Sequence, residues 1–291
     1  MDTLKLHEIP GRVTIATGNG GLPVIQVHSD FSSAEIYLHG AHVTGFQKHG
    51  EAPLLFMSAA SDFHEEKPIR GGVPVIFPWF GGREGMAAHG FARLAEWDLA
   101  ATSLLPDGSV KLTLQLPADD PYDVTFEVIV GSSLSMTLAV SHTGDTPFTF
   151  ETCLHTYFQI GDIHQLAVSG LQGAIFYDQV LGTQLTETAD AIRFTAETDR
   201  IYQDTDATVR IDDPVLNRSI EVSKTGSKST VVWNPWIAKS QRMPDFGDDE
   251  YLQMVCVESG NVREHAVTLF PGEKTLLTVE LRSLPLHGPV E

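Results

Sequence analysis

The sequence has few cysteines and lacks the common cofactor motifs. Only two of its 291 residues are cysteine, Cys153 and Cys256. No CxxC or Cys/His ligand spacing occurs, so neither a disulfide framework nor a structural zinc site is predicted. No GxGxxG, GxxxxGK[ST], GxSxG or HExxH pattern is present, which argues against nucleotide binding and against a hydrolase elbow or zinc protease site. We therefore expect no cofactor and no metal.

Basic residues and long apolar runs are also scarce. The 19 Lys+Arg stand against 38 Asp+Glu, giving a formal net charge of −19. Such a surface repels nucleic acid and anionic membranes. The longest apolar stretch, residues 73–80, is too short to span a membrane, and the N-terminal region lacks a signal-peptide core. We expect a soluble, cytoplasmic protein.

Short strands dominate what is present. Alternating apolar and polar stretches are broken by Gly, Pro, Asp and Asn at short intervals, and no long amphipathic helix is visible. Turn residues at 106–109 and 131–133 predict two hairpins. About eighteen to twenty strands without intervening helices predict an all-β antiparallel sandwich or barrel. Residues 59–67 are the best candidate for a short helix.

A single domain over residues 1–291 is the simplest organisation. The length fits either two ordinary domains or one large all-β domain. No repeat, low-complexity segment or linker is visible. A boundary at 117–122 is the alternative, although that stretch fits a hairpin loop equally well. We expect a monomer.

Residues 148–158 form an apolar, strand-like stretch that contains a histidine. Strand alternation places Glu151, Cys153, His155 and Tyr157 on one face. A core histidine with satisfied hydrogen bonds is one interpretation of His155, and a catalytic acid or base is the other. The position of Glu151 on the same face leaves its role open.

A second buried strand is predicted at residues 252–257 and ends in Glu258. A carboxylate there is costly unless it is paired or lies in a cleft. The alternative is an ordinary strand-end glutamate that faces water. His155 and Glu258 each follow a cysteine by two residues. If the two strands face one cleft, an acid–base pair and both thiols gather there.

Residues 69–97 are irregular and apolar, yet they carry Arg70, Arg83, His89 and Arg93. Arginines are favoured where carboxylate or phosphate oxygens are held in a fixed geometry. The alternative is that each arginine pairs with a surface carboxylate. Three arginines within 24 residues of an acidic protein favour an anion-binding role.

Two further stretches leave alternatives open. Residues 199–213 are dense in aspartate, and most of these are expected in turns, while one could contact a hydroxylated ligand. Residues 233–251 form a long connection. Its aromatic side chains fit a sugar site or the core equally well.

Six motifs together resemble the glucose-6-phosphate 1-epimerases, or hexose-6-phosphate mutarotases, of the galactose mutarotase-like group. They follow the family order and comprise GAHV (40–43), RGGVPVIFPWFG (70–81), HGFAR (89–93), LHTYF (154–158), VVWNPW (231–236) and VCVESGNV (255–262). The resemblance implies one large antiparallel β-sandwich with few short helices and a ligand cleft. It also implies cofactor-independent interconversion of the α and β anomers of a hexose 6-phosphate, glucose 6-phosphate above all.

The resemblance implies a role for each matching position. His155 and Glu258 match the catalytic histidine and glutamate. A carboxylate raises the pKa of a nearby imidazole, so we expect Glu258 ionised as the base and His155 protonated as the acid. The substrate-binding positions are Arg70, His89, Arg93 and Asp204, with the arginines on phosphate and Asp204, whose rival is Asp206, on a sugar hydroxyl.

Two other functions remain open at this point. One is an aldose 1-epimerase that acts on unphosphorylated sugar, and the arginines of residues 69–97 argue against it. The other is a sugar-phosphate-binding protein without catalysis, because a fold does not determine a function. The sequence does not assign a role to Arg83.

Overall fold

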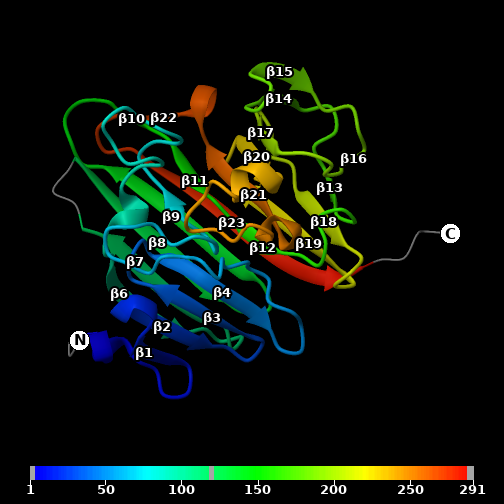
Figure 1. The fold of residues 1–291 in the computed structure, drawn as a ribbon. Coiled ribbons are helices and arrows are strands. Elements are labelled where there is room, and N and C mark those ends of the chain that lie inside the picture. The colour runs from blue at the N-terminus through cyan, green and yellow to red at the C-terminus, as the bar shows by residue number, and fades with distance from the viewer. Residues whose placement is uncertain (1–3, 118–120, 287–291) are drawn as a thin grey trace.

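The computed structural model describes residues 4–117 and 121–286, and strands make up most of its regular structure (Figure 1). The α-helix α1, Trp236–Ser240, is only 5 residues long. Short 3-10 helices cover Leu4–His7, Asn19–Gly21, Ala92–Leu94, Glu250–Gln253 and Arg263–His265. No helix in the described ranges is long and apolar enough to cross a membrane.

The largest layer is a nine-stranded antiparallel sheet. Its order is β16 (Ala191–Ile192), β13 (Ala167–Ser169), β18 (Val209–Asp213), β19 (Arg218–Thr225), β23 (Lys274–Pro285), β9 (Leu134–His142), β8 (Tyr122–Val130), β7 (Val110–Leu116) and β6 (Asp98–Leu104). In β8 the buried positions alternate with more exposed ones. One face of this sheet therefore packs on the core.

An eight-stranded sheet forms the second large layer, and its central strands β20 and β21 are yellow to orange in Figure 1. Its order is β15 (Thr183–Thr186), β14 (Ile175–Asp178), β17 (Thr198–Tyr202), β20 (Ser229–Asn234), β21 (Met254–Asn261), β11 (Thr152–Leu154) and β5 (Val75–Ile76), and β12 (Tyr157–Gln159) also pairs with β21. All of β20 and β21 is buried. Both faces of these two central strands are therefore covered.

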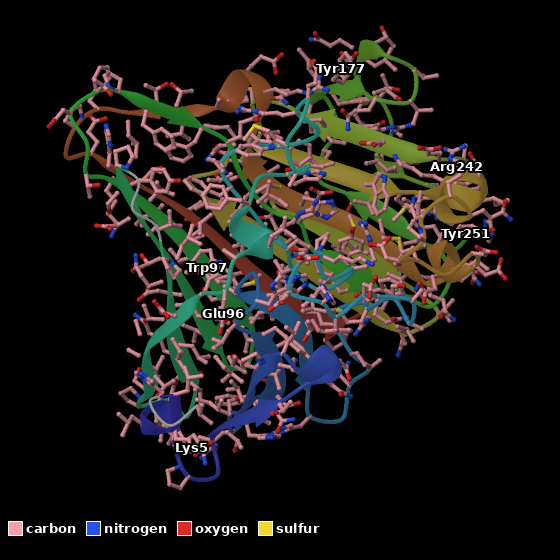
Figure 2. All side chains as sticks on the ribbon, turned by 60° about the vertical axis from the view of Figure 1, so that its left-hand side comes forward. Lys5, Glu96, Trp97, Tyr177, Arg242 and Tyr251 are labelled. Atoms are coloured by element: carbon pink, nitrogen blue, oxygen red, sulfur yellow. The ribbon has the colours of Figure 1, made fainter. Side chains whose placement is uncertain are left out.

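Two smaller sheets complete the fold. The first contains β1 (Val13–Thr17), β2 (Pro23–His28), β3 (Ser32–Tyr37) and β4 (His42–Lys48), coloured blue in Figure 1, and the second pairs β10 (Phe148–Phe150) with β22 (Val267–Leu269). One hydrophobic cluster runs through the layers and includes the fully buried Trp97, labelled in Figure 2. The single domain over residues 1–291 stays a prediction.

The structure confirms the all-β antiparallel architecture. The hairpins at 106–109 and 131–133 join β6 to β7 and β8 to β9. Strands β7 and β8 also pair antiparallel. Residues 118–120 of the alternative boundary at 117–122 lie outside the described residues.

The short helix expected at residues 59–67 is wrong. The segment forms isolated turns, one of them closed by the Lys67 N–H donating to the His64 oxygen at 3.0 Å. The Phe63 ring packs against Tyr37 with 5.1 Å between ring centroids. Tertiary packing of this aromatic ring outweighs the weak helix propensity of the segment.

Candidate active site

The register of one strand pair brings His155 and Glu258 together. Leu154 pairs with Ser259 and Tyr157 pairs with Cys256, so His155 lies directly opposite Glu258 of β21. The strand expected at 148–158 is broken into β10, β11 and β12, and residues 155–156 lie between the last two. The register is the same on both sides of this break. The His155 Nε2 and Glu258 Oε1 atoms are 3.1 Å apart.

Alternation along each strand directs the pair away from the core. Val255 and Val257 point to one face of β21, and Cys256 and Glu258 point to the other. Trp233 pairs with Cys256 and with Asp199, which extends the same face across β20 and β17. One sheet face therefore carries the acid–base pair and its polar surroundings.

Both thiols lie beside Glu258, as the sequence predicted. The Cys153 thiol donates to Glu258 Oε2 at 3.6 Å, and both cysteines are free and buried. Burial, followed by the Glu258 charge, raises the pKa of each thiol well above its ordinary value. Cys153 pairs with Gly260, four residues from Cys256 along β21. That offset is about 13 Å at the usual strand rise, too far for a disulfide without backbone movement.

The sheet face forms the floor of a cleft with a volume of about 420 Å³. Side chains of three regions line it. The sheet contributes His155, Tyr157, Asp199, Val231, Trp233 and Glu258, with Gln179 beside it; residues 70–89 contribute Arg70, Phe80, Gly81, Gly82 and His89; and residues 239–243 contribute Lys239 and Met243.

Arg70 is held in the cleft wall by two partners. Its Nε and Nη2 both donate to Asp245 Oδ2, at 3.1 and 3.0 Å, and its Nη1 donates to the Tyr157 hydroxyl at 3.0 Å. Burial opposes the charge of Arg70, but Tyr157 and Asp245 outweigh it and raise the pKa. The guanidinium is therefore a fixed positive charge beside the acid–base pair.

His89 lies next to His155, and Arg93 acts on the same acid–base pair through its charge. Arg93 does not line the cleft; its Nη2 donates to the Ala88 oxygen at 2.7 Å, and burial lowers its pKa to about 10. The His89 and His155 rings have centroids 5.7 Å apart. Burial, followed by Arg93, lowers the pKa of His89 to about 3, so His89 is neutral near pH 7.

The protonation states of the pair differ from the sequence-based expectation. Burial, followed by His89, Arg70 and Arg93, lowers the pKa of His155 well below its ordinary value. Burial, followed by Asp199, raises the pKa of Glu258 well above its ordinary value. In the protein alone the proton is therefore favoured on Glu258 and not on His155, because desolvation and nearby cations outweigh the mutual attraction. The pair still holds the same number of protons.

Two glycines explain how the irregular segment places its basic side chains. Gly72 has φ 58°, and a Cβ there would lie 2.3 Å from the Val43 oxygen. Gly90 has φ 74°, and a Cβ there would lie 2.0 Å from the Phe77 oxygen. A side chain at either position would clash with backbone and strain the left-handed conformation. These glycines therefore allow the close backbone packing around Arg70 and His89.

The structure answers the open questions about Glu151 and Arg83. Glu151 accepts the Phe80 N–H at 2.9 Å and the Arg263 N–H at 2.6 Å. It therefore fastens the cleft-lining residues near Phe80 to the chain after β21. The guanidinium of Arg83 lies 4.8 Å from the centroid of the Trp79 ring and does not line the cleft.

The structure does not bring Asp204 to the cleft, and Asp199 lies there instead. Strand β17 ends at Tyr202, and Asp204 follows it in an exposed turn with φ 52°, where its N–H donates to His265 Nε2 at 3.0 Å. Asp199 lies within β17 and lines the cleft. The rival Asp206 is also exposed, and pairs with Lys228 at 3.6 Å. The turn after β17 separates both later aspartates from the cleft.

Sequence reasoning assigned no role to several cleft residues. Asp199 is bound by Gln179 Nε2 at 2.7 Å and lies 3.4 Å from Lys239 Nζ. Asp245 anchors Arg70 from the long connection. The sequence does not show that β17 pairs with β20, and this pairing is what brings Asp199 to the cleft. Nor does it show the contact of Asp245 with Arg70, because the two residues are 175 positions apart.

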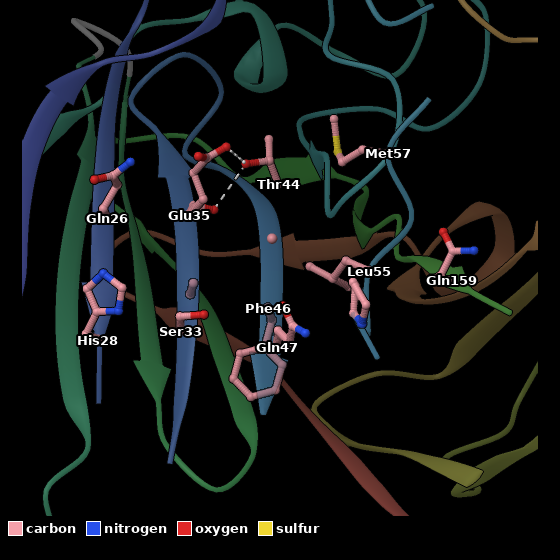
Figure 3. Close-up of a pocket in the computed structure, with 13 residues that line it drawn as sticks. Gln26, His28, Ser33, Glu35, Thr44, Phe46, Gln47, Leu55, Met57 and Gln159 are labelled. Carbon is pink, nitrogen blue, oxygen red and sulfur yellow. Dashed lines mark hydrogen bonds between the residues drawn. The ribbon is translucent and has the colours of Figure 1, made fainter. Parts of the chain in front are cut away.

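A second hollow lies on the four-stranded sheet and has a volume of about 550 Å³ (Figure 3). Its polar lining includes Gln26, His28, Glu35, Gln47 and Gln159, and the Thr44 hydroxyl donates to Glu35 Oε1 at 2.9 Å. Neither arginine nor lysine lines it. The smaller cleft, and not this hollow, therefore combines an acid–base pair with a fixed cation.

The fold and this cleft define a class of sugar-converting β-sandwich. The structure matches a crystal structure described as a "putative mutarotase" from Salmonella typhimurium with a TM-score of 0.88 and 29% identity, over 96% of both chains. It also has the fold of a galactose mutarotase-like protein from Clostridium acetobutylicum, with a TM-score of 0.70 at 13% identity over 94% of this chain and 98% of that one.

The family model for aldose 1-epimerase matches residues 23–282, so the chain belongs to the aldose 1-epimerase family. The chain is also 36% identical over 269 residues to a "Putative glucose-6-phosphate 1-epimerase" of Cenchrus ciliaris, covering 87% of this chain and 82% of that protein.

Replacing Glu258 with Gln should stabilise the protein increasingly as the pH rises. A raised folded-state pKa means that the contribution of Glu258 to stability is fully present below its ordinary value of 4.5 and is lost at higher pH. The neutral Gln escapes this loss. We expect the Tm of Glu258→Gln minus that of wild type to grow from about pH 5 to about pH 8. The exposed Glu84→Gln is the control, and a flat difference for Glu258→Gln would contradict the burial argument.

Proposed function

We propose that this protein interconverts the α and β anomers of a hexose 6-phosphate, with glucose 6-phosphate as the substrate. The observation that carries the proposal is the His155–Glu258 pair, 3.1 Å apart on a cleft floor beside Arg70. Membership of the aldose 1-epimerase family supports the reaction. The name of the Cenchrus ciliaris relative supports the phosphorylated substrate.

Anomer exchange needs two proton transfers at one carbon. The C1 hydroxyl loses a proton while the ring oxygen gains one, the ring opens, the aldehyde rotates, and the ring closes with the transfers reversed. Both oxygens are attached to C1, so the protein groups that serve them must also be neighbours. Glu258 takes the hydroxyl proton and His155 protonates the ring oxygen. The pair then holds a protonated carboxyl and a neutral imidazole, the state that burial favours.

The phosphate has a second role in this scheme besides affinity. Arg70 and Arg93 both lower the pKa of His155. A phosphate bound in the cleft beside Arg70 offsets part of this positive potential, and so raises the pKa of His155 toward the protonated form that begins the reaction. Substrate binding thereby favours ionised Glu258 with protonated His155, and the proton transfers of ring opening leave both groups neutral.

Loss of either partner should remove most of the catalysis. We expect His155→Ala and Glu258→Gln each to lower kcat by roughly 10²–10⁴-fold, the usual contribution of a positioned acid or base. NMR exchange between the two anomers of glucose 6-phosphate measures the rate, corrected for the uncatalysed reaction. Full activity of His155→Ala would refute the mechanism. Substrate binding by the wild type without accelerated exchange would instead select a binding protein.

Arg70 should distinguish a phosphorylated from an unphosphorylated substrate. A charged hydrogen bond contributes about 1.5–3 kcal/mol, so Arg70→Gln should raise the KM for glucose 6-phosphate roughly 10–100-fold and change the KM for free glucose far less. Arg83→Gln, from the same segment but outside the cleft, is the matched control. If the wild type exchanges glucose as fast as glucose 6-phosphate, the protein is a general aldose 1-epimerase.

Variants of Asp199 and Asp204 test which aspartate contacts the sugar, because the structure favours Asp199 and the sequence favoured Asp204. Asp199→Asn removes a cleft carboxylate, and we expect kcat/KM to fall about tenfold or more, because a charged hydrogen bond to a sugar hydroxyl is lost. Asp204→Asn changes an exposed turn and should leave kcat/KM unchanged. The opposite pattern would restore the role that the sequence assigned to Asp204.

We propose further that the enzyme is a cytoplasmic monomer whose partner is the small sugar phosphate. The two buried free thiols suit a reducing compartment. The acidic surface, with a formal net charge of −19, disfavours nucleic acid and anionic membranes as partners. Light scattering of the purified protein checks the oligomeric state.

A further inference from the structure

Cys256 is a buried thiol that the proposed reaction does not use. It lies opposite Tyr157 on one neighbouring strand and opposite Trp233 on the other, on the face that carries Glu258. One ligand atom each from His155, Cys256 and Glu258 lies within 4.8 Å of the other two. A thiol, an imidazole and a carboxylate thus lie close together, with His155 and Glu258 lining the cleft and Cys256 buried behind its floor.

These three groups are ligands that zinc prefers. Catalytic zinc sites use three protein ligands and leave a fourth position open, with bonds of about 2.0–2.3 Å to nitrogen, oxygen and sulfur. Tetrahedral geometry then places the ligand atoms about 3.3–3.8 Å apart. The His155–Glu258 separation of 3.1 Å is close to this range. The thiol therefore has to approach by only about 1 Å to complete the set.

The two ring nitrogens of His155 have different surroundings. His155 is buried, and its Nδ1 has no hydrogen-bond partner within the described part of the chain. Nε2, which faces Glu258, is the ring nitrogen that a cation at this point would take, and Nδ1 points to the other side of the ring. Cys153 differs from Cys256, because its thiol donates to Glu258 Oε2 and it is not one of the three converging residues.

We propose that the cleft is an inhibitory site for a thiophilic divalent cation such as Zn²⁺, bound by Cys256, His155 and Glu258. The cation binds the imidazole and carboxylate lone pairs that proton transfer requires, so it competes with the sugar. Binding displaces the proton of the thiol and the proton shared by the pair. The site itself needs only this ligand geometry, whereas its inhibitory effect rests on the proposed mutarotase function.

Cobalt titration tests the site without any assay of activity. Co²⁺ bound by a thiolate gives a sulfur-to-metal charge-transfer band, and the chain has only two cysteines. We expect one equivalent of Co²⁺ to produce this band in wild type and in Cys153→Ser, and Cys256→Ser to abolish it. Near-ultraviolet circular dichroism verifies the fold, with Cys256→Ala as the substitute if the Ser variant does not fold.

Measuring anomer exchange in the presence of Zn²⁺ then tests whether the bound cation inhibits the reaction. Loss of even an outer-shell partner weakens metal binding about 10–100-fold, so the half-inhibiting Zn²⁺ concentration should rise at least about tenfold in Cys256→Ser. It should rise much less in Cys153→Ser, because a serine hydroxyl keeps a donor beside Glu258. Each variant is compared with its own zinc-free rate. Absence of the cobalt band in wild type, or its survival in Cys256→Ser, overturns the site. A cobalt band without any anomer exchange supports the site and overturns the proposed function instead.

Discussion

The site depends on one cross-strand register. His155 lies opposite Glu258 because β11 and β12 continue the same pairing with β21 on either side of a two-residue break. Side chains alternate along a strand, so a shift of one strand by one residue would turn one of the two groups to the opposite face of the sheet. The register therefore determines the 3.1 Å contact and the side of the sheet on which the cleft forms.

Burial shifts the pKa values of His155 and Glu258, and it also lowers the stability of the protein when the pair is charged. A carboxyl and an imidazole taken out of water both favour their neutral forms, and their pKa values move accordingly. Such a pair lowers stability at pH values where Glu258 must ionise. The burial of β20 and β21 along their whole length shows how much of the surrounding structure is needed to hold the pair in place.

The covering segments supply the positive charge that the protein otherwise lacks. In a chain with 38 acidic and 19 basic residues, Arg70 keeps its orientation through Asp245 and Tyr157. Glu151 connects Phe80, on the cleft wall, to Arg263 beyond the end of β21. A local cation in an acidic protein attracts an anionic ligand only at that place. The acidity of the protein and the proposed phosphate site are therefore compatible.

Local periodicity and unusual residues in apolar runs were enough to predict the all-β class and the hairpins and to single out His155, Glu258 and Arg70. The roles of these three residues came from a family resemblance. The tertiary structure decided what depends on distant pairing. It placed Asp199 rather than Asp204 in the cleft, joined Asp245 to Arg70, and reversed the favoured protonation of the acid–base pair. Burial and the field of remote charges set a pKa, and neither can be derived from the neighbours of a residue along the chain.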